Sequence, residues 1–489
     1  MHWYGNIKLL LKLENLIKKP HILYFLSVMI FGTFLAVLNP LDQESDGDMH
    51  FYRASDVSYG NVLGPFCVIN HDPMIEEIPG NFDKYPFWVL TADQNEAPEY
   101  NRKLKKVETT WETSEYFDPR TYSSFYYYPQ AFGLVVARIL HTSAYGATIW
   151  AHMMNLLAYA LITAWAVKLM PIYKNLFMAS CMMPMCVYLA ASFSADALLN
   201  AACFLFIAAV FRYAYDDKKQ NLGIKEMLPL GILLWFIYTN KYVYAVLGLL
   251  VFLIPREKFG DKKNYWKTFG IALIPIVAYI IFQIARGAFV PQYNLLDVLG
   301  QTKEDAGTDG TLFPGMTQKE FVMAYPFEFV KVLVRTIYCG LTDWPIGANT
   351  FGWMKVGMEP ITYWLPIIYI LILLFDAGQK ENGEKINLKM WHKVLMVVTS
   401  LVLICAVISS IYIFDEAANI VGWAKARGIQ GRYFLVLVPL LCIGLVPQKI
   451  ESKSKNLPYK VLTVMSLVLA LTVYIFYKHY YAFGILNFY

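Results

Sequence analysis

A short acidic segment near the start of the chain combines residue types that carry out acid and base chemistry. Four carboxylates stand within seven residues, at Asp42, Glu44, Asp46 and Asp48. A carboxylate can deprotonate an acceptor hydroxyl while a sugar is displaced from a phosphate leaving group. Asp46 is our candidate for this catalytic base, although an acidic loop also holds carboxylates that take no part in a reaction.

The spacing Asp46-Gly47-Asp48 resembles a D-x-D element. Two such carboxylates can hold a divalent cation, Mg²⁺ or Mn²⁺, that bridges to a substrate phosphate. His50 and Arg53 follow in the same segment, and we expect them to support it. The alternative for these two residues is a purely structural role, in which they cap and anchor the loop.

A second group of candidate residues could bind an anion. Arg432 opens an apolar run beside Tyr433, and Lys241 lies between two short apolar runs. The guanidinium of Arg432 can bind a phosphate through two parallel hydrogen bonds, and the ammonium of Lys241 is a point charge. Arg432, Lys241 and Tyr433 are therefore candidates for binding the phosphate of a lipid carrier. The alternative is that both cations only reach from a helix end to the membrane surface. Asp196 is a further supporting candidate, or the first-turn acid of a helix.

The composition predicts the elements that must position these residues. The chain has 489 residues, of which 57% are hydrophobic and 16% charged, and its mean hydropathy is +0.41. Apolar runs of about 20 residues cross a bilayer as helices, which satisfy their own backbone hydrogen bonds there. We therefore predict an all-α, polytopic transmembrane helical bundle with about eleven spans. No P-loop, zinc pattern or nucleic-acid-binding surface is present, so we expect the lipid bilayer as a partner and no nucleic acid.

Residues 227–254 are predicted to form two short helices that meet near Lys241. The other predicted spans fall at residues 22–39, 147–169, 173–193, 196–214, 268–285, 361–376, 393–412, 431–446 and 459–477. Lys and Arg exceed Asp and Glu in the loops assigned to the inside, which predicts a cytoplasmic N-terminus. That topology requires residues 126–141 to form an interfacial or re-entrant helix. It also gathers Asp46, Asp196, Lys241, Asp415, Glu416 and Arg432 at the extracytoplasmic end.

The predicted segments are a cytoplasmic amphipathic lead-in (1–20), the first span (21–39), an external catalytic loop (40–125), a core membrane module with the interfacial helix (126–285), a second external segment (286–360) and a C-terminal membrane module (361–489). The localisation expected from this order is a multi-pass protein of the cell membrane with an extracytoplasmic active site.

Several short motifs resemble, in order, those of a large bacterial family of multispanning proteins grouped with the GT-C glycosyltransferases. The motifs are Asn39-Pro40, Asp46 with His50-Phe-Tyr-Arg-Ala54, Ser58-x-Gly60, Tyr128-Pro129, Pro184, Ser194-x-Asp196-Ala, Asn200, Lys241-Tyr242 and Gln430-Gly-Arg-Tyr-Phe434. The resemblance extends from about residue 30 to residue 446. It implies a GT-C-type bundle with a large first extracytoplasmic loop.

The resemblance also implies an activity. Such an enzyme takes a sugar from a polyprenyl-phosphate carrier and transfers it, with inversion, to a surface glycan or a lipid-linked acceptor, with Asp46 as the catalytic residue. Two positions depart from the family pattern: Ser45-Asp46-Gly47 stands where Pro-Asp-Glu is common, and Lys355 stands where Asp is expected. The alternatives are a lipid-linked glycan flippase or transporter and a polysaccharide polymerase or ligase.

Overall fold

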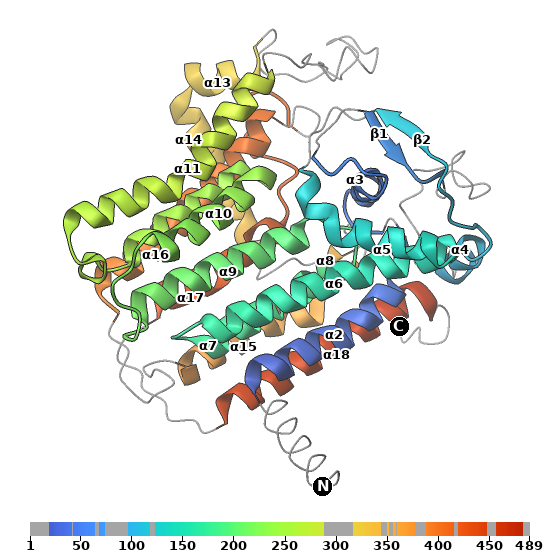
Figure 1. Cartoon of the computed structure of the whole chain (residues 1–489), viewed down its shortest axis with the longest axis horizontal. Coiled ribbons are helices and arrows are strands. Elements are labelled where there is room, and N and C mark those ends of the chain that lie inside the picture. Colours follow the sequence, from blue (N-terminus) through green and yellow to red (C-terminus); the bar gives the residue numbers. More distant parts are fainter. Residues whose placement is uncertain are drawn as a thin grey trace. The chain divides into compact units, whose positions relative to one another are not determined.

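A computed structural model describes residues 19–41, 43–63, 68–73, 96–117, 123–287, 316–343, 350–351, 356–357, 359–376, 388–414, 419–446 and 456–482. This part of the chain is mostly helical (Figure 1). It forms two compact units that are interleaved along the sequence. Unit 1 comprises Met1–Ala209, Thr350–Asn387 and Pro447–Tyr489, and unit 2 comprises Val210–Asn349 and Leu388–Val446.

The elements of unit 1 are α2 (Pro20–Leu38), α3 (Gly47–Ser58), β1 (Val68–His71), α4 (Glu96–Leu104), β2 (Ser114–Phe117), η2 (Ser124–Tyr127), α5 (Tyr128–Ile139), α6 (Ala144–Leu169), α7 (Lys174–Cys181), α8 (Pro184–Ala190), most of α9 (Asp196–Tyr215), β3 (Thr350–Phe351), β4 (Val356–Gly357), α15 (Glu359–Asp376) and α18 (Leu457–Tyr481). Helix α2 packs against α6 and α18, and α5 packs against α6. The α5–α6 contact is close because Gly133 has no side chain: a Cβ there would lie 2.6 Å from backbone atoms of Trp150 and Ala151.

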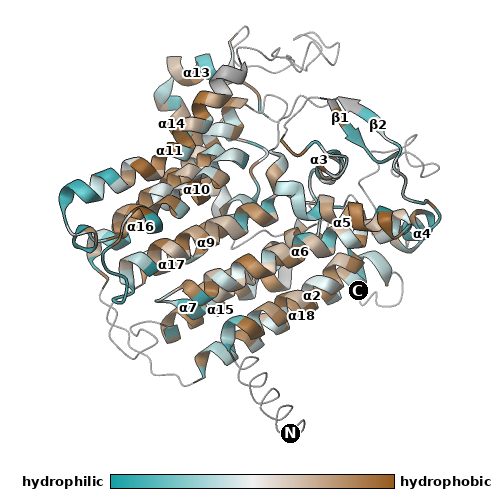
Figure 2. Ribbon diagram, viewed as in Figure 1, coloured by the Kyte–Doolittle hydropathy of each residue, from teal (hydrophilic) through white to brown (hydrophobic). Residues whose placement is uncertain are grey.

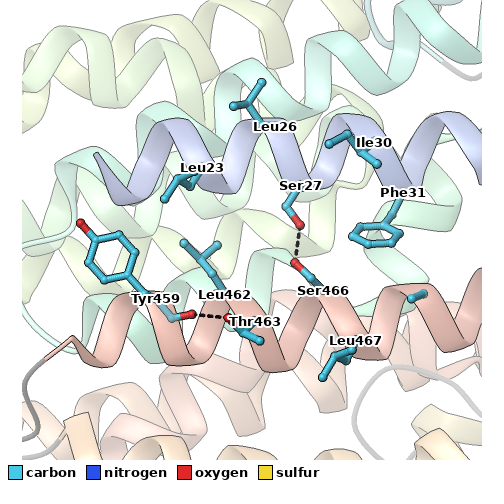
Figure 3. Close-up of a pocket in the computed structure, with 11 residues that line it drawn as sticks. Leu23, Leu26, Ser27, Ile30, Phe31, Tyr459, Leu462, Thr463, Ser466 and Leu467 are labelled. Atoms are coloured by element: carbon cyan, nitrogen blue, oxygen red, sulfur yellow. Dashed lines mark hydrogen bonds between the residues drawn. The ribbon is translucent and has the colours of Figure 1, made fainter. Parts of the chain in front are cut away.

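The first and last described spans, α2 and α18, lie side by side although they are far apart in the sequence (Figure 1). Their contact includes a hydrogen bond of 2.7 Å between the hydroxyls of Ser27 and Ser466. Figure 3 shows this pair within a groove of about 560 Å³ whose other walls are mainly leucine and aromatic side chains. This hydrogen bond satisfies both serine hydroxyls, which apolar surroundings would otherwise leave without a hydrogen bond.

The elements of unit 2 are the end of α9, α10 (Ile224–Asn240), η3 (Tyr242–Leu253), η4 (Arg256–Phe259), α11 (Lys262–Gly287), α13 (Gln318–Ala324), α14 (Pro326–Asp343), α16 (Met390–Phe414), η5 (Gly431–Leu437) and α17 (Val438–Leu445). Helix α10 packs against α11, and α16 packs against η3 and α17. The pair α10 and η3 meets at Lys241, where the sequence predicted two short helices to meet.

Six helices in the described part of the chain are long and apolar enough to cross a membrane: α2, α6, α9, α11, α16 and α18. Figure 2 shows hydrophobic residues along these helices, with hydrophilic residues mainly at their ends and in the connections. These helices confirm the prediction of a helical membrane protein with several spans. The total of eleven spans stays a prediction.

Two details of the predicted fold were wrong. Residues 173–193 are not one continuous helix. Helix α7 ends before Met182–Met183, and a new helix, α8, begins with Pro184 in its first turn. Proline lacks the N–H that a continuing helix needs, and its ring clashes with the preceding turn. The chain is also not entirely α-helical, because β1 pairs with β2 and β3 with β4 in two small antiparallel sheets.

The helix expected within residues 126–141 is present as α5, a helix of 12 residues. At 1.5 Å per residue it is about 18 Å long, which is shorter than a hydrocarbon core of about 30 Å. Its length therefore agrees with an interfacial or re-entrant helix.

Candidate functional site

Asp46 stands at the junction between the first span and α3. Helix α2 ends at Leu38, and Asp46 is the residue that immediately precedes α3. Its backbone adopts the left-handed conformation, with φ 61° and ψ 30°. Aspartate tolerates this conformation better than most residues, but it still costs roughly 1 kcal/mol. Asp46 and Asp48 are both half-buried, and Asp48 lies in the first turn of α3, where the helix dipole favours a negative charge.

Glu44 is the buried member of the acidic segment. Its side chain is fully buried, and its carboxylate accepts a hydrogen bond of 2.8 Å from the backbone N–H of Phe193. A longer contact of 3.5 Å joins it to the side-chain amide of Asn39. The pKa of Glu44 is raised to about 7, mainly because burial disfavours the ionised carboxylate. Hydrogen bonds to the carboxylate lower this pKa, and the nearby Asp48 charge makes a smaller contribution that raises it. The sequence pattern included Glu44 in the cluster but gave it no role.

The two residues predicted to support the segment both lie on α3 and are buried. The Nδ1 atom of His50 lies 2.8 Å from the hydroxyl of Tyr127, which precedes α5. Arg53 lies near Asp56. Burial raises the pKa of the Asp56 carboxyl, and the charge of Arg53 partly offsets this rise. The His50 contact joins α3 to the residue before α5, whereas the interaction between Arg53 and Asp56 lies within α3 itself.

A buried arginine of α5 links that helix both to α3 and to Asp72, which directly follows β1. Arg138 on α5 donates a hydrogen bond of 2.8 Å to the hydroxyl of Ser58 at the end of α3. It also lies 3.4 Å from the carboxylate of Asp72, and both side chains of this pair are about 1% exposed. The guanidinium is 4.0 Å from the ring centroid of Tyr59. The sequence showed Arg138 within an apolar run, but it did not identify Asp72 as its partner.

The strand β1, which pairs with β2, is attached to the same helix. The backbone N–H of Asp72 donates to the hydroxyl of Ser55 at 2.8 Å, and the backbone N–H of Asn70 donates to the carboxylate of Asp56 at 3.0 Å. Helix α3 is therefore held by β1 and the residue after it through Ser55 and Asp56, and by α5 through Ser58. A helix held at several points presents the residue at its start, Asp46, in a defined position.

Asp196 is 6% exposed and begins α9, as the structural alternative predicted. Its backbone N–H donates to the hydroxyl of Ser194 at 3.2 Å. The turn before it, which includes Phe193, contacts the acidic segment through Glu44 and packs against α3 through the ring of Phe51. The structure thus brings the turn that carries Asp196 to the acidic segment, within unit 1.

Three of the predicted site residues come together in unit 2. The Lys241 ammonium lies 4.6 Å from the ring centroid of Tyr433, and the Arg432 guanidinium lies 5.3 Å from the same centroid. Tyr244, which the sequence did not single out, donates a hydrogen bond of 2.6 Å to the carbonyl of Tyr433. Arg432 is only 5% exposed. We refer to Lys241, Arg432 and Tyr433 as the cation cluster.

The cation cluster also lies at the starts of two 3₁₀-helices. Lys241 directly precedes η3, and Arg432 is the second residue of η5. The 3₁₀-helix η3 has 12 residues, whereas such helices rarely exceed four. The backbone N–H groups at a helix start favour negative charge, so both the side chains and the backbone of the cation cluster suit an anion.

The chain matches the family described as predicted membrane protein (DUF2142) over residues 29–441. The chain belongs to this family. No curated protein and no solved structure matches the chain. The DUF2142 match covers both Asp46 and the cation cluster, and together with the six candidate spans it establishes a membrane protein in contact with a lipid bilayer.

Some predicted residues of this DUF2142 protein lie outside the described residues: Asp42, Lys355, Asp415 and Glu416. Among the described residues, no group of three or more His, Cys, Asp or Glu side chains could hold a metal ion. Mg²⁺ commonly binds one or two carboxylates and takes its other ligands from water and substrate phosphate. A cation held by Asp46 and Asp48 would therefore need a substrate phosphate as a further ligand, and this cation stays a prediction.

Proposed function

We propose that this DUF2142 protein is an inverting glycosyltransferase of the GT-C type that uses a polyprenyl-phosphate sugar as donor. The acceptor hydroxyl oxygen attacks the anomeric carbon from the side opposite the phosphate. The bond between that carbon and the phosphate oxygen breaks, and polyprenyl phosphate leaves with the electron pair. The acceptor proton passes to the carboxylate of Asp46. The acceptor is a cell-surface glycan or another acceptor, such as a lipid-linked one.

The observation that carries this proposal is the position of Asp46. Asp46 is half-buried, lies between the first span and α3, and has a strained backbone. Backbone strain persists where the surrounding structure enforces it, and it concentrates at functional sites. The contacts of Ser55, Asp56 and Ser58 enforce the position of the helix that Asp46 precedes. A carboxylate fixed at the end of a span is well placed for a substrate that is carried in the membrane.

The cation cluster supports the donor class. Both cations lie beside the Tyr433 ring, so an anion bound in this region is attracted by two positive charges. Arg432 offers a planar fork that matches two phosphate oxygens, while Lys241 supplies a point charge. In the proposed reaction, these residues bind the phosphate and stabilise the charge that it gains as it leaves. Tyr433 holds both cations by its ring face.

Glu44 and His50 affect the charge and the position of the acidic segment. The pKa of Glu44 is about 7, so close to neutral pH this side chain is partly protonated and places less negative charge beside Asp48. His50 fixes α3 against Tyr127. If a divalent cation is used, Asp46 and Asp48 would hold it, and it would neutralise charge on the donor phosphate.

A transfer assay tests the proposal. The purified chain in lipid nanodiscs is incubated with a panel of polyprenyl-phosphate sugars and candidate glycan acceptors, with and without a chelator. We expect one donor to yield polyprenyl phosphate and a product of inverted anomeric configuration. Movement of an intact lipid-linked glycan across the bilayer without bond cleavage would instead identify a flippase, and a requirement for a lipid-linked oligosaccharide donor would identify a polymerase or ligase.

A further inference from the structure

Helix α14 has two faces of different chemistry, and one of them is exposed. Five apolar side chains follow each other at helical spacing from the end of α13 along α14. They are Met323 (65% exposed), Phe327 (83%), Val330 (52%), Val334 (61%) and Tyr338 (74%). We call these residues the α14 stripe. The four stripe residues of α14 are three or four positions apart, which places them on one side of that helix, and Met323 lies at the end of the preceding helix α13.

The opposite side of α14 is buried against the end of a membrane span. Val332 of α14 belongs to a core cluster with Phe321, Ile408, Tyr412 and Ala426. Ile408 and Tyr412 lie in the last two turns of α16, which ends at Phe414. Helix α14 therefore lies beside the terminus of a candidate span. Under the topology predicted from the charged loops, this is the extracytoplasmic end of the span.

Charged residues next to the stripe argue against α14 as a membrane span of its own. Glu328, Lys331 and Arg335 lie within its 18 residues, and each basic side chain at the centre of a bilayer costs about 2.5–3.5 kcal/mol. Lys331 is 2.7 Å from Glu328 and both are well exposed, as suits charged groups that face water. Long basic side chains beside an apolar face can extend to lipid phosphates.

The apolar surface of the span continues towards α14. Helix α16 exposes Leu401, Val402 and, at its last residue, Phe414, which is 72% exposed. A span surface of this kind faces lipid, and the α14 stripe is exposed beside the same end of α16. We propose that α14 lies in the boundary between lipid and water, with its stripe inserted among the acyl chains just below the headgroups and with Lys331 and Arg335 at the level of the phosphates.

This placement has a consequence for the cation cluster, although the membrane contact itself does not depend on the proposed reaction. The hydroxyl of Thr336 on α14 accepts a hydrogen bond of 3.0 Å from the backbone N–H of Ala426. The side chain of Gln318 on α13 donates to the carbonyl of Asn419 at 3.0 Å. Residues 419–430 lead directly into η5, which carries Arg432. An interfacial α14 would thus hold the segment before Arg432 at the headgroup level, where a lipid-linked phosphate lies.

Fluorescence quenching in nanodiscs tests the placement. An environment-sensitive fluorophore is attached to Val334→Cys on the stripe and to Glu328→Cys on the water-facing flank of the same helix. The unmutated chain, labelled in the same way, gives the background from its own cysteines. We expect the Val334→Cys label to emit at shorter wavelength, to be quenched most by lipids with a nitroxide near the headgroup, and to be protected from aqueous iodide. The Glu328→Cys label should show the reverse pattern.

Three results would overturn the proposal. Equal quenching of both labels by iodide would place the stripe in water. Protection of the Val334→Cys label from both iodide and nitroxide lipids would show that a protein surface, such as a second copy of the chain, covers it. Strongest quenching by a nitroxide at the centre of the bilayer would show that α14 spans the membrane.

Discussion

Replacement of Glu44 by glutamine should flatten the pH dependence of stability. The ordinary pKa of a glutamate is 4.5, whereas that of Glu44 in the folded chain is about 7. Between these two values the folded chain binds more protons than the unfolded chain, so the free energy of unfolding falls as pH rises through this window. Above about pH 7 the loss is complete. At 1.36 kcal/mol per pKa unit, the ionised carboxylate costs the folded chain about 3 kcal/mol at pH 8.

Glutamine at position 44 keeps the shape of the side chain and cannot titrate. Its carbonyl oxygen can still accept the hydrogen bond from the backbone N–H of Phe193. The contact with Asn39 is long, so rearrangement there should cost no more than an ordinary hydrogen bond, about 1 kcal/mol. We therefore expect Glu44→Gln to match the wild type near pH 5 and to exceed its stability at pH 8.

The assay is thermal unfolding of both chains in the same nanodiscs, followed by intrinsic fluorescence at intervals from pH 5 to pH 8. Other titrating groups are shared by the two chains, so they largely cancel in the difference between the two melting curves. Glu99→Gln, at an exposed carboxylate on α4, serves as the control and should follow the wild type. A difference between Glu44→Gln and wild type that does not change with pH would refute the assignment of a raised pKa to buried Glu44.

Three further outcomes are expected. Arg432→Lys keeps the charge but loses the two-pronged contact with phosphate, so steady-state kinetics should show a donor KM raised roughly tenfold, or about 1.4 kcal/mol; an unchanged KM and kcat would count against a phosphate role. Arg138→Met removes the positive charge that lies beside the buried carboxylate of Asp72, so it should destabilise unit 1 by about 3–5 kcal/mol. The measurement is thermal unfolding: a large drop in melting temperature is expected, and an unchanged melting temperature would contradict the role of the ion pair. If Asp46 and Asp48 hold a cation, chelation should abolish transfer and Mg²⁺ or Mn²⁺ should restore it, whereas full activity in chelator would exclude this cation.

The parts of the fold that could be predicted from sequence are those governed by long apolar runs. A helix that crosses a bilayer needs about 20 apolar residues, and α2, α6 and α18 each carry such a run. The junction at Lys241 was also predictable, because a cation between two short apolar runs marks their common end. The break before Pro184 was missed because the predicted span was judged by hydropathy, which a single proline hardly changes.

The contacts that hold the acidic segment were much less predictable. A sequence shows that Arg138 sits in an apolar run, but only the fold brings Asp72 and Ser58 to its guanidinium. In the same way, four clustered carboxylates look equivalent until burial against Phe193 distinguishes Glu44 from its neighbours. The grouping of Lys241 with Tyr433 was expected from topology, whereas the contribution of Tyr244 depends on a hydrogen bond to a backbone carbonyl that carries no sequence signal.

The most direct test of the central claim is the rate of sugar transfer by Asp46→Asn, measured with saturating polyprenyl-phosphate sugar and beside Glu99→Gln as control. Asparagine preserves the size of the side chain and tolerates the left-handed backbone, so the fold should be retained. Loss of a general base typically slows a reaction about 10²- to 10⁴-fold. We expect a loss of that order in Asp46→Asn, with melting temperature and expression unchanged and with full activity in the control. Transfer by Asp46→Asn at the wild-type rate would contradict the assignment of Asp46 as the catalytic base.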